Sequence, residues 1–238
     1  MFYSPDREVS GLPFNPFKSC CVPRPIGWVS TVSAAGVHNL APYSQFQNLT
    51  WDPPTVMIAA NCRNDGQLRD TTANILETGE FVWNMATFEQ REMVVGSSRE
   101  YPSEVDEFEA LGIPHHPSIH VRPRRVAGSP VQFECRLTQR LEVPGNTPAA
   151  NTWLLVGRVV GIHIADEVLT PDGRIDIVRL RPLARMGYRD YTDISHVYEL
   201  SEFTGRVAAT IPHLHESIPS QPHQGDRHEA RAHACHQP

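Results

Sequence analysis

The feature that most constrains the fold is a series of three short apolar runs separated by turn residues. Residues 26–33, 40–49 and 55–62 alternate or concentrate apolar side chains over lengths typical of β-strands. The segment 34–36 (Ala-Ala-Gly) can reverse the chain, since glycine tolerates positive φ, and the segment 52–54 (Asp-Pro-Pro) imposes an extended backbone before the third run. The stretch therefore predicts antiparallel strands joined by turns.

Polar side chains crowd onto these predicted strands, which would otherwise fill a core. They are Ser30, Thr31, Ser33, Asn39, Tyr43, Ser44, Gln45, Gln47, Asn48 and Thr50. Strand ends rich in hydroxyl and amide groups often line a site for a polar ligand, whereas an antiparallel sheet with one solvated face gives the same alternation without a function. The residues alone leave both interpretations open, although Arg24, between two prolines, favours an anion site.

A predicted helix over residues 67–77, closed by Gly79, offers a second candidate for anion binding. Arg63, Arg69 and the Thr71 hydroxyl surround its start, where free N–H groups and the helix dipole favour phosphate. The alternative is that the two arginines merely form surface pairs with Asp65 and Asp70, which contribute little.

The second half of the chain predicts a long β-hairpin. Residues 131–143 alternate apolar and polar side chains, a Pro-Gly-Asn turn follows, and residues 153–165 return as a strand. Gly157 and Gly161 within the returning strand predict sharp curvature or the close approach of another backbone.

Several ordered motifs resemble one known family. They are PRPIGWVST, G-x-x-N-L-A-P-Y-S-x-F, W-D-P-P, RNDGQLRDTTANILETGEFVWN, VDEFEALGI, SPVQFEC and RPLARMGYRDYT. Together they resemble the flavin reductase-like family of FMN-binding split barrels, which includes flavoredoxin, over residues 19–201. The resemblance implies a mainly β fold with short helices, an FMN-binding split β-barrel of Greek-key type in one domain.

The same resemblance implies an oxidoreductase, an NAD(P)H-dependent flavin reductase that transfers hydride from nicotinamide to flavin N5. FMN is the expected cofactor, with FAD as an alternative, and NADH or NADPH the transient donor. A homodimer is implied, and a partner monooxygenase is a further candidate. Two alternatives stay open: a protein that holds FMN tightly and passes electrons to a protein or small organic acceptor, and a non-catalytic flavin-binding protein. No G-x-G-x-x-G fingerprint occurs, so a Rossmann-type nucleotide site is not expected.

Candidate cofactor-binding residues follow from the motifs and from what a flavin needs, namely phosphate ligands, donors along the ring edge and an apolar bed. They are Ser30, Thr31, Ala41, Pro42, Tyr43, Ser44, Phe46, Asn48, Arg63, Gln67, Asp70, Thr71 and Arg185. The resemblance places the Arg185 region near the flavin of its own or the partner chain. Members of the family often carry a lysine near Gln67; its absence here makes Arg63 more important. No catalytic residue is assigned.

Charge and composition exclude several other classes. A formal net charge of −6 argues against nucleic-acid binding. No secretory signal and no transmembrane span are recognised, and the five cysteines form no paired framework, so a reduced cytoplasmic protein without a membrane segment is expected. The histidines near residue 115 lack partners at ligand spacing, so no metal site is expected. The arginines at 122, 124 and 125 predict a solvated loop or, alternatively, a contact to a nicotinamide dinucleotide phosphate.

The expected organisation has three parts. Residues 1–18 form an N-terminal arm, residues 19–205 the flavin reductase-like domain, and residues 212–238 a His-rich tail. The tail contains too few apolar residues to bury a core, so its composition predicts disorder.

Overall fold

The computed structural model describes residues 1–5 and 10–200. Met1–Val197 forms one compact unit, and a second unit begins at Tyr198. The predicted tail at 212–238 lies outside the described residues. No helix of the described part is long and apolar enough to span a membrane.

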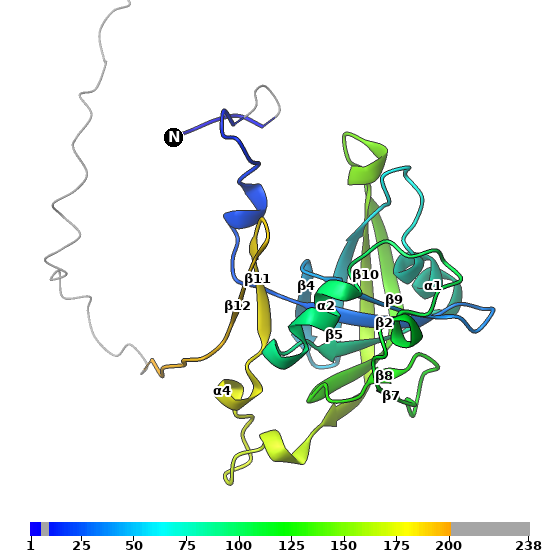
Figure 1. The fold of residues 1–238 in the computed structure, drawn as a ribbon, viewed down its shortest axis with the longest axis vertical. Coiled ribbons are helices and arrows are strands. Elements are labelled where there is room, and N and C mark those ends of the chain that lie inside the picture. Colours follow the sequence, from blue (N-terminus) through cyan, green and yellow to red (C-terminus); the bar gives the residue numbers. More distant parts are fainter. Residues whose placement is uncertain (6–9, 201–238) are drawn as a thin grey trace, which may run out of the picture. The chain divides into compact units, whose positions relative to one another are not determined.

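The compact unit is built on a seven-stranded antiparallel sheet with the order β3-β2-β6-β9-β10-β5-β4. Figure 1 labels β2, β4, β5, β9 and β10 of this sheet. Its strands are β2 (Gly27–Val32), β3 (His38–Tyr43), β4 (Phe46–Trp51), β5 (Pro54–Asn61), β6 (Glu80–Met85), β9 (Val131–Val143) and β10 (Thr152–Ile164). The sheet coils without closing, because no pairing joins β3 to β4 at its two edges. The prediction of a mainly β split barrel is confirmed.

Two smaller sheets and several short helices complete the unit. One sheet has the order β1-β11-β12, with β1 (Arg24–Pro25), β11 (Leu183–Gly187) and β12 (Asp190–Asp193); the other pairs β7 (His115–His116) with β8 (Arg125–Val126). The helices are α1 (Asp70–Thr78), α2 (Arg91–Gly96), α3 (Glu107–Ala110) and α4 (Ile177–Leu180). Single 3₁₀ turns are η1 (Phe17–Ser19), η2 (Phe88–Gln90), η3 (Pro148–Ala150) and η4 (Asp166–Val168).

The β9–β10 hairpin is the longest element and confirms the predicted hairpin. Its first strand has the predicted bounds, and its second runs antiparallel to β9 on one side and to β5 on the other. A Cβ at Gly157 would collide with the ring of Phe81, so this glycine allows a core side chain to reach the strand. The close approach at Gly157 is thus that of a side chain rather than of another backbone, and the β9–β10 register shifts at both Gly157 and Gly161.

The first polar stretch differs from its prediction in one respect. The run 40–49 is two strands rather than one, since the chain bends at Ser44 and Gln45. Before the bend β3 pairs with β2, and after it β4 pairs with β5. The bend therefore connects the two edge strands of the sheet.

The core consists of two clusters of buried apolar residues. In the larger cluster the Trp83 ring lies 5.3 Å from the parallel ring of Phe46 and 4.5 Å from the ring of Phe133. The second cluster packs Trp28 and Leu40 of the sheet against α2, α3 and Leu183. This second cluster attaches the helices and β11 to the sheet, and the cavity described next lies between these parts.

Candidate functional site

A cavity of about 260 Å³ opens where the ends of β3 and β5 meet the start of α1. The segment Ser97–Tyr101, which follows α2, forms another wall, and Glu107 of α3 also lines it. The bend between β3 and β4 contributes Ser44 and Gln45, at the point where strand pairing stops. Polar and charged side chains dominate the lining, which suits an anionic or strongly polar ligand.

Several residues predicted to bind cofactor lie together in this cavity. They are Ala41, Pro42, Tyr43, Ser44, Arg63, Asp70 and Thr71. They come from β3, from the loop after β5 and from the start of α1, so the fold brings together segments that are separate in the sequence. Ala41, Pro42 and Ala59 give one wall a small apolar surface.

Ser30 and Thr31 do not line the cavity. Both are buried on β2, where the Ser30 hydroxyl donates to the Arg124 carbonyl oxygen at 2.5 Å. The Thr31 hydroxyl donates to Asn39 Oδ1 at 3.4 Å, and Asn39 does line the cavity. These two hydroxyls therefore hold neighbouring segments in place, and Thr31 reaches the cavity only through Asn39.

The remaining predicted residues also lie outside the cavity. Phe46 is part of the core, whereas Asn48 on β4 and Gln67 in the loop before α1 are exposed. Arg185 on β11 places its guanidinium 4.3 Å from the centre of the Tyr191 ring and donates to the Tyr188 carbonyl. The Arg185 side chain therefore lines no part of the cavity within its own chain.

The start of α1 gives the cavity electropositive backbone. The helix begins at Asp70, and its N-cap Arg69 has an extended backbone with no side-chain hydrogen bond to the first turn. N–H groups at such a start carry partial positive charge and have no partner inside the helix. At the other end Gly79 ends the helix with φ 72°, as predicted. The uncapped first turn is therefore suited to an anion.

Two arginines lie beside this helix start, and each has an acidic partner. Arg63 Nη2 lies 2.6 Å from Asp70 Oδ2, and Arg69 Nη1 lies 3.4 Å from Glu100 Oε1. The sequence left open that the two arginines pair with Asp65 and Asp70. Arg63 does pair with Asp70, whereas Arg69 pairs with Glu100. All four side chains line the cavity, so pairing does not remove the arginines from it.

A buried polar network forms the floor of the cavity. Asn39 Oδ1 accepts from the Thr71 hydroxyl at 2.7 Å, and Asn39 Nδ2 donates to Glu107 Oε1 at 2.9 Å. The second Glu107 oxygen accepts from the Leu40 N–H at 2.9 Å. Because these groups satisfy one another, the floor is held in one arrangement without a ligand.

Burial shifts the pKa of two groups at this floor. Desolvation raises the pKa of Glu107 above its usual value, although hydrogen bonds from Asn39 and from the Leu40 N–H oppose the shift. Desolvation likewise raises the pKa of Tyr43, against an opposing hydrogen bond with Thr71. The floor therefore contains a carboxyl group for which the neutral form is favoured by burial.

Sequence reasoning missed several residues of the cavity. Glu107 belongs to a motif of the family, yet nothing in the sequence indicates that this acid is buried rather than its neighbours Asp106 and Glu109. The polar run Ser97–Tyr101 resembles an ordinary surface loop, although Arg99 within it lines the cavity. Only the packing of α2 and α3 against β3 places these residues at the site.

The fold and the cavity together define a split β-barrel protein with a built polar site beside a helix start. Residues 19–187 match the flavin reductase like domain family. The chain belongs to this family. An uncharacterized protein of Aquifex aeolicus is 36% identical over 170 residues, which cover 71% of this chain and 84% of that protein. The uncharacterized protein YwrF of Bacillus subtilis is 30% identical over 184 residues, 75% of this chain and 87% of YwrF.

Solved structures of similar fold span nearly the same extent. Component B of nitrilotriacetate monooxygenase from Bacillus cereus has a TM-score of 0.77 at 26% identity, with 84% of this chain and 98% of that chain covered. The 2-nitrobenzoate 2-nitroreductase NbaA of Pseudomonas fluorescens has a TM-score of 0.75 at 24% identity, with 88% and 100% covered. Flavoredoxin of Desulfovibrio vulgaris has a TM-score of 0.67 at 18% identity, with 84% and 100% covered. The last two likenesses establish the fold alone.

Proposed function

We propose that the protein is a cytoplasmic FMN-binding oxidoreductase, an NAD(P)H-dependent flavin reductase that binds its flavin in the cavity at the start of α1. The observation that carries the proposal is the uncapped first turn of α1 with Arg63 and Arg69 beside it, in a chain of the flavin reductase like family. Bound FMN would supply hydride and single-electron transfer.

The charged end of the cavity fits a phosphate. The N–H groups at the start of α1 supply donors, and the two arginines supply charge next to them. The Thr71 hydroxyl already donates to Asn39, so the contribution of Thr71 to a phosphate is its backbone N–H rather than a hydroxyl proton. The side-chain amide of Asn39 in turn fixes the position of Thr71.

The opposite end of the cavity fits a flat ring. Ala41, Pro42 and Ala59 are small, so a ring can approach the strands closely. Ser44 and Gln45 lie in the bend between β3 and β4, where the Gln45 carbonyl accepts the Ala59 N–H at 2.8 Å while the Ser44 and Gln45 N–H groups lie outside the paired strands. Donors at this bend would stabilise negative charge along the edge of a reduced ring.

A second cavity supports a binding place for the hydride donor. It has a volume of about 390 Å³, is lined by Phe88, Val95, Leu183 and Tyr191 among others, and shares Arg99 with the first cavity. An apolar chamber next to the flavin site would receive a nicotinamide ring, and Arg99 would contact the anionic part of the dinucleotide.

We also propose a homodimer, with a monooxygenase as a candidate acceptor of reduced flavin. Apolar side chains are exposed on the edge strand β4 and on β9: Leu49, Trp51 (87% exposed), Leu141 and Val143. An edge strand with exposed apolar side chains favours association with a second copy. The monooxygenase follows from the likeness to component B of nitrilotriacetate monooxygenase. In such a dimer Arg185, which lies outside its own cavity, could reach the partner's flavin.

The deciding experiment is the visible absorption spectrum of the protein incubated with FMN and freed of excess, recorded without oxygen before and after adding NADH or NADPH. Flavin bands that bleach on addition support the reductase. Bands that persist with both nicotinamides would contradict the reductase activity but still support flavin binding. A protein that takes up no FMN would contradict the whole proposal. Size-exclusion chromatography with light scattering tests the dimer.

A further inference from the structure

The three arginines at 122, 124 and 125 differ in how their charges are balanced. Arg122 Nε lies 3.1 Å from Glu80, and Arg124 Nη1 lies 3.2 Å from Asp106. Arg125 instead donates to two neutral acceptors, the Pro117 carbonyl at 3.2 Å and Gln132 Oε1 at 3.1 Å. No described carboxylate lies within ion-pair distance of Arg125. Its half-buried positive charge is therefore not compensated by the described part of the chain.

Arg125 is also held in place from several sides. Gln132 is buried and donates through Nε2 to the carbonyls of Val126 and Ser129, so its Oε1 faces the guanidinium in one orientation. The backbone of the next residue, Val126, donates to Asn84 Oδ1 at 2.8 Å. The guanidinium of Arg125 offers five N–H donors in a fixed fork, and these contacts leave part of the fork unused.

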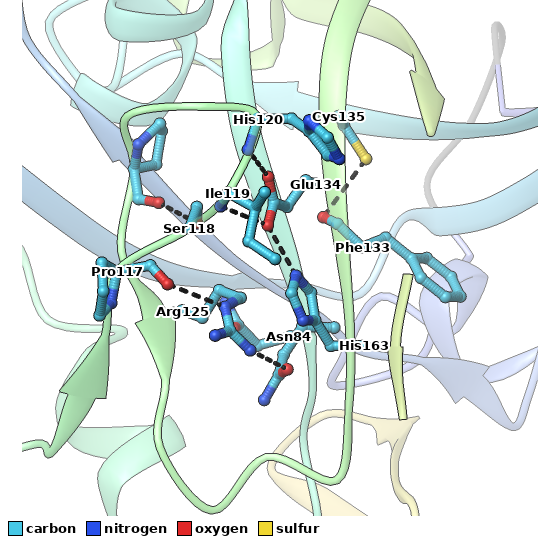
Figure 2. A network of polar contacts seen from close by, with 12 residues as sticks. Asn84, Pro117, Ser118, Ile119, His120, Arg125, Phe133, Glu134, Cys135 and His163 are labelled. Carbon is cyan, nitrogen blue, oxygen red and sulfur yellow. Dashed lines mark hydrogen bonds and ion pairs between the residues drawn. The ribbon is translucent and has the colours of Figure 1, made fainter. Parts of the chain in front are cut away.

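A histidine next to this arginine is fixed by a buried carboxylate (Figure 2). His163 Nε2 lies 2.6 Å from Glu134 Oε1, and Glu134 is fully buried. The same carboxylate accepts the backbone N–H groups of Ile119 at 2.8 Å and His120 at 2.5 Å. Because Glu134 has so many donors, it cannot rotate away, and it sets the orientation of the His163 ring. No described residue bonds the other ring nitrogen of His163.

Burial alone would raise the pKa of Glu134, but the hydrogen bonds from Ile119, His163 and His120 outweigh it and lower that pKa. Glu134 therefore acts as a fixed negative charge behind His163. The arrangement resembles the carboxylate–imidazole pairs that orient histidine towards a ligand.

Arg125 and His163 both line a cavity of about 490 Å³. His116, which is the cross-strand partner of Arg125 in the β7–β8 hairpin, lines the same cavity. The side chains of Ile162 and Ile164 add apolar surface, and the exposed Glu167 is the only carboxylate among the described residues that line the cavity. None of its lining residues lines the cavity at the start of α1, so the two are separate sites.

We propose that this cavity binds a small molecule through an oxyanion, a phosphate or a carboxylate group, held by Arg125 and His163 with His116 at the side. The Arg125 N–H donors that Pro117 and Gln132 leave unused can bind oxygens of such a group. His163, whose Nε2–H donates to Glu134, supplies a second, fixed contact through Nδ1–H in its imidazolium form. The body of the ligand lies against Ile162 and Ile164. The volume lies in the range of small-molecule sites.

The test is isothermal titration of the FMN-saturated protein, so that the cavity at the start of α1 is already filled. Inorganic phosphate, acetate and adenosine 2′-monophosphate are titrated separately at constant ionic strength. We expect saturable binding of phosphate or acetate, and Arg125→Gln to weaken it by about tenfold or more, as for a lost charge-assisted hydrogen bond. The matched control is Arg158→Gln, which removes the same charge from an exposed position on β10 and leaves the affinity unchanged.

Several outcomes separate the sources of the anion. If phosphate binds and acetate does not, the ligand is phosphorylated; if acetate binds and phosphate does not, the ligand is a carboxylate. Tighter binding of adenosine 2′-monophosphate than of phosphate supports contacts with the body of the ligand. His163→Gln reduces the affinity as well, and the imidazole C–H resonances of His163 shift on saturation. Absence of binding by all three probes, or equal affinity in Arg125→Gln with an unchanged unfolding curve, overturns the proposal.

Discussion

The two polar cavities of this barrel balance charge in opposite ways. At the start of α1 the arginines Arg63 and Arg69 each have an acidic partner, so the positive character at the helix start itself comes from backbone N–H groups, and Arg99, which pairs with no described acid, lies on another wall. Beside β8 the acidic group, Glu134, is buried behind a histidine, and the excess positive charge is the side chain of Arg125. We therefore expect the partners of each arginine, rather than the number of arginines near a cavity, to decide how strongly that cavity attracts an anion.

The two buried glutamates give the largest expected difference between these cavities. Glu134→Ala leaves two backbone N–H groups and His163 without their acceptor, so we expect a loss of about 3–5 kcal/mol in the free energy of unfolding. Glu107→Ala leaves only the Asn39 amide and the Leu40 N–H without their acceptor. We therefore expect a smaller loss, about 1–3 kcal/mol in the free energy of unfolding.

Urea unfolding followed by circular dichroism measures both changes. The exposed Glu92→Ala serves as the control, with an expected change within about 0.5 kcal/mol. If Glu107→Ala destabilises as much as Glu134→Ala, the carboxylate behind His163 is no more constrained than the one at the flavin cavity.

Arg63→Ala sharpens the comparison at the flavin cavity. The substitution removes a cation beside the α1 start and leaves Asp70 without its partner, so we expect FMN binding to weaken by about 1.5–3 kcal/mol. Fluorescence quenching of FMN titrated with protein gives the dissociation constant. Arg158→Ala, on exposed β10, is the control. An unchanged dissociation constant in Arg63→Ala places the phosphate away from this helix start.

Arg99→Gln tests the residue shared by the flavin cavity and its apolar neighbour. Arg99 is exposed, and no described acid pairs with it, so screened contacts to a bound dinucleotide are worth about 0.5–1 kcal/mol. We expect a higher KM for the nicotinamide, a dependence on salt, and little change in kcat. Steady-state assays at low and high ionic strength measure this effect. A lower kcat with an unchanged KM would contradict a role in binding the donor.

The sequence predicted the frame of the fold better than the contents of the site. Alternation gave the bounds of β9, and Gly79 ended α1 as expected, because both signals are local. Ala41 to Ser44, Arg63 and Thr71, which were predicted to bind cofactor, lie in one cavity. Ser30 and Thr31 do not, because β2 is buried on both faces and its hydroxyls bond to neighbouring segments instead.

Residues placed by tertiary packing gave no comparable signal. Glu107 lies in a four-residue helix between two other acids, and only the contact of α3 with β3 buries it. Arg125 has a similar explanation: adjacent arginines are equivalent in the sequence, and the positions of Glu80, Asp106 and Gln132 in the fold decide which of them keeps an unbalanced charge.

The smallest expected effect is an opposite pH dependence of the two glutamates. The pKa of Glu134 is lowered in the folded protein, so its contribution to stability is present above the usual value of 4.5 and is lost as the pH falls through the folded pKa. The pKa of Glu107 is raised, so the folded state holds its proton longer, and the contribution of Glu107 is present below 4.5 and is lost as the pH rises through its folded pKa.

Urea midpoints measured on both sides of that value separate the two groups. Relative to the unmodified protein, Glu134→Gln should lose less stability on acidification, because the variant no longer has a carboxylate that must be protonated. Glu107→Gln should lose less stability as the pH rises above 4.5, because the uncharged amide replaces a group that ionises in a buried position. Parallel pH profiles for both variants would contradict the opposite placement of charge in the two cavities. Opposite profiles would show that the floor of the flavin cavity favours a neutral side chain, while the wall behind His163 favours a charged one.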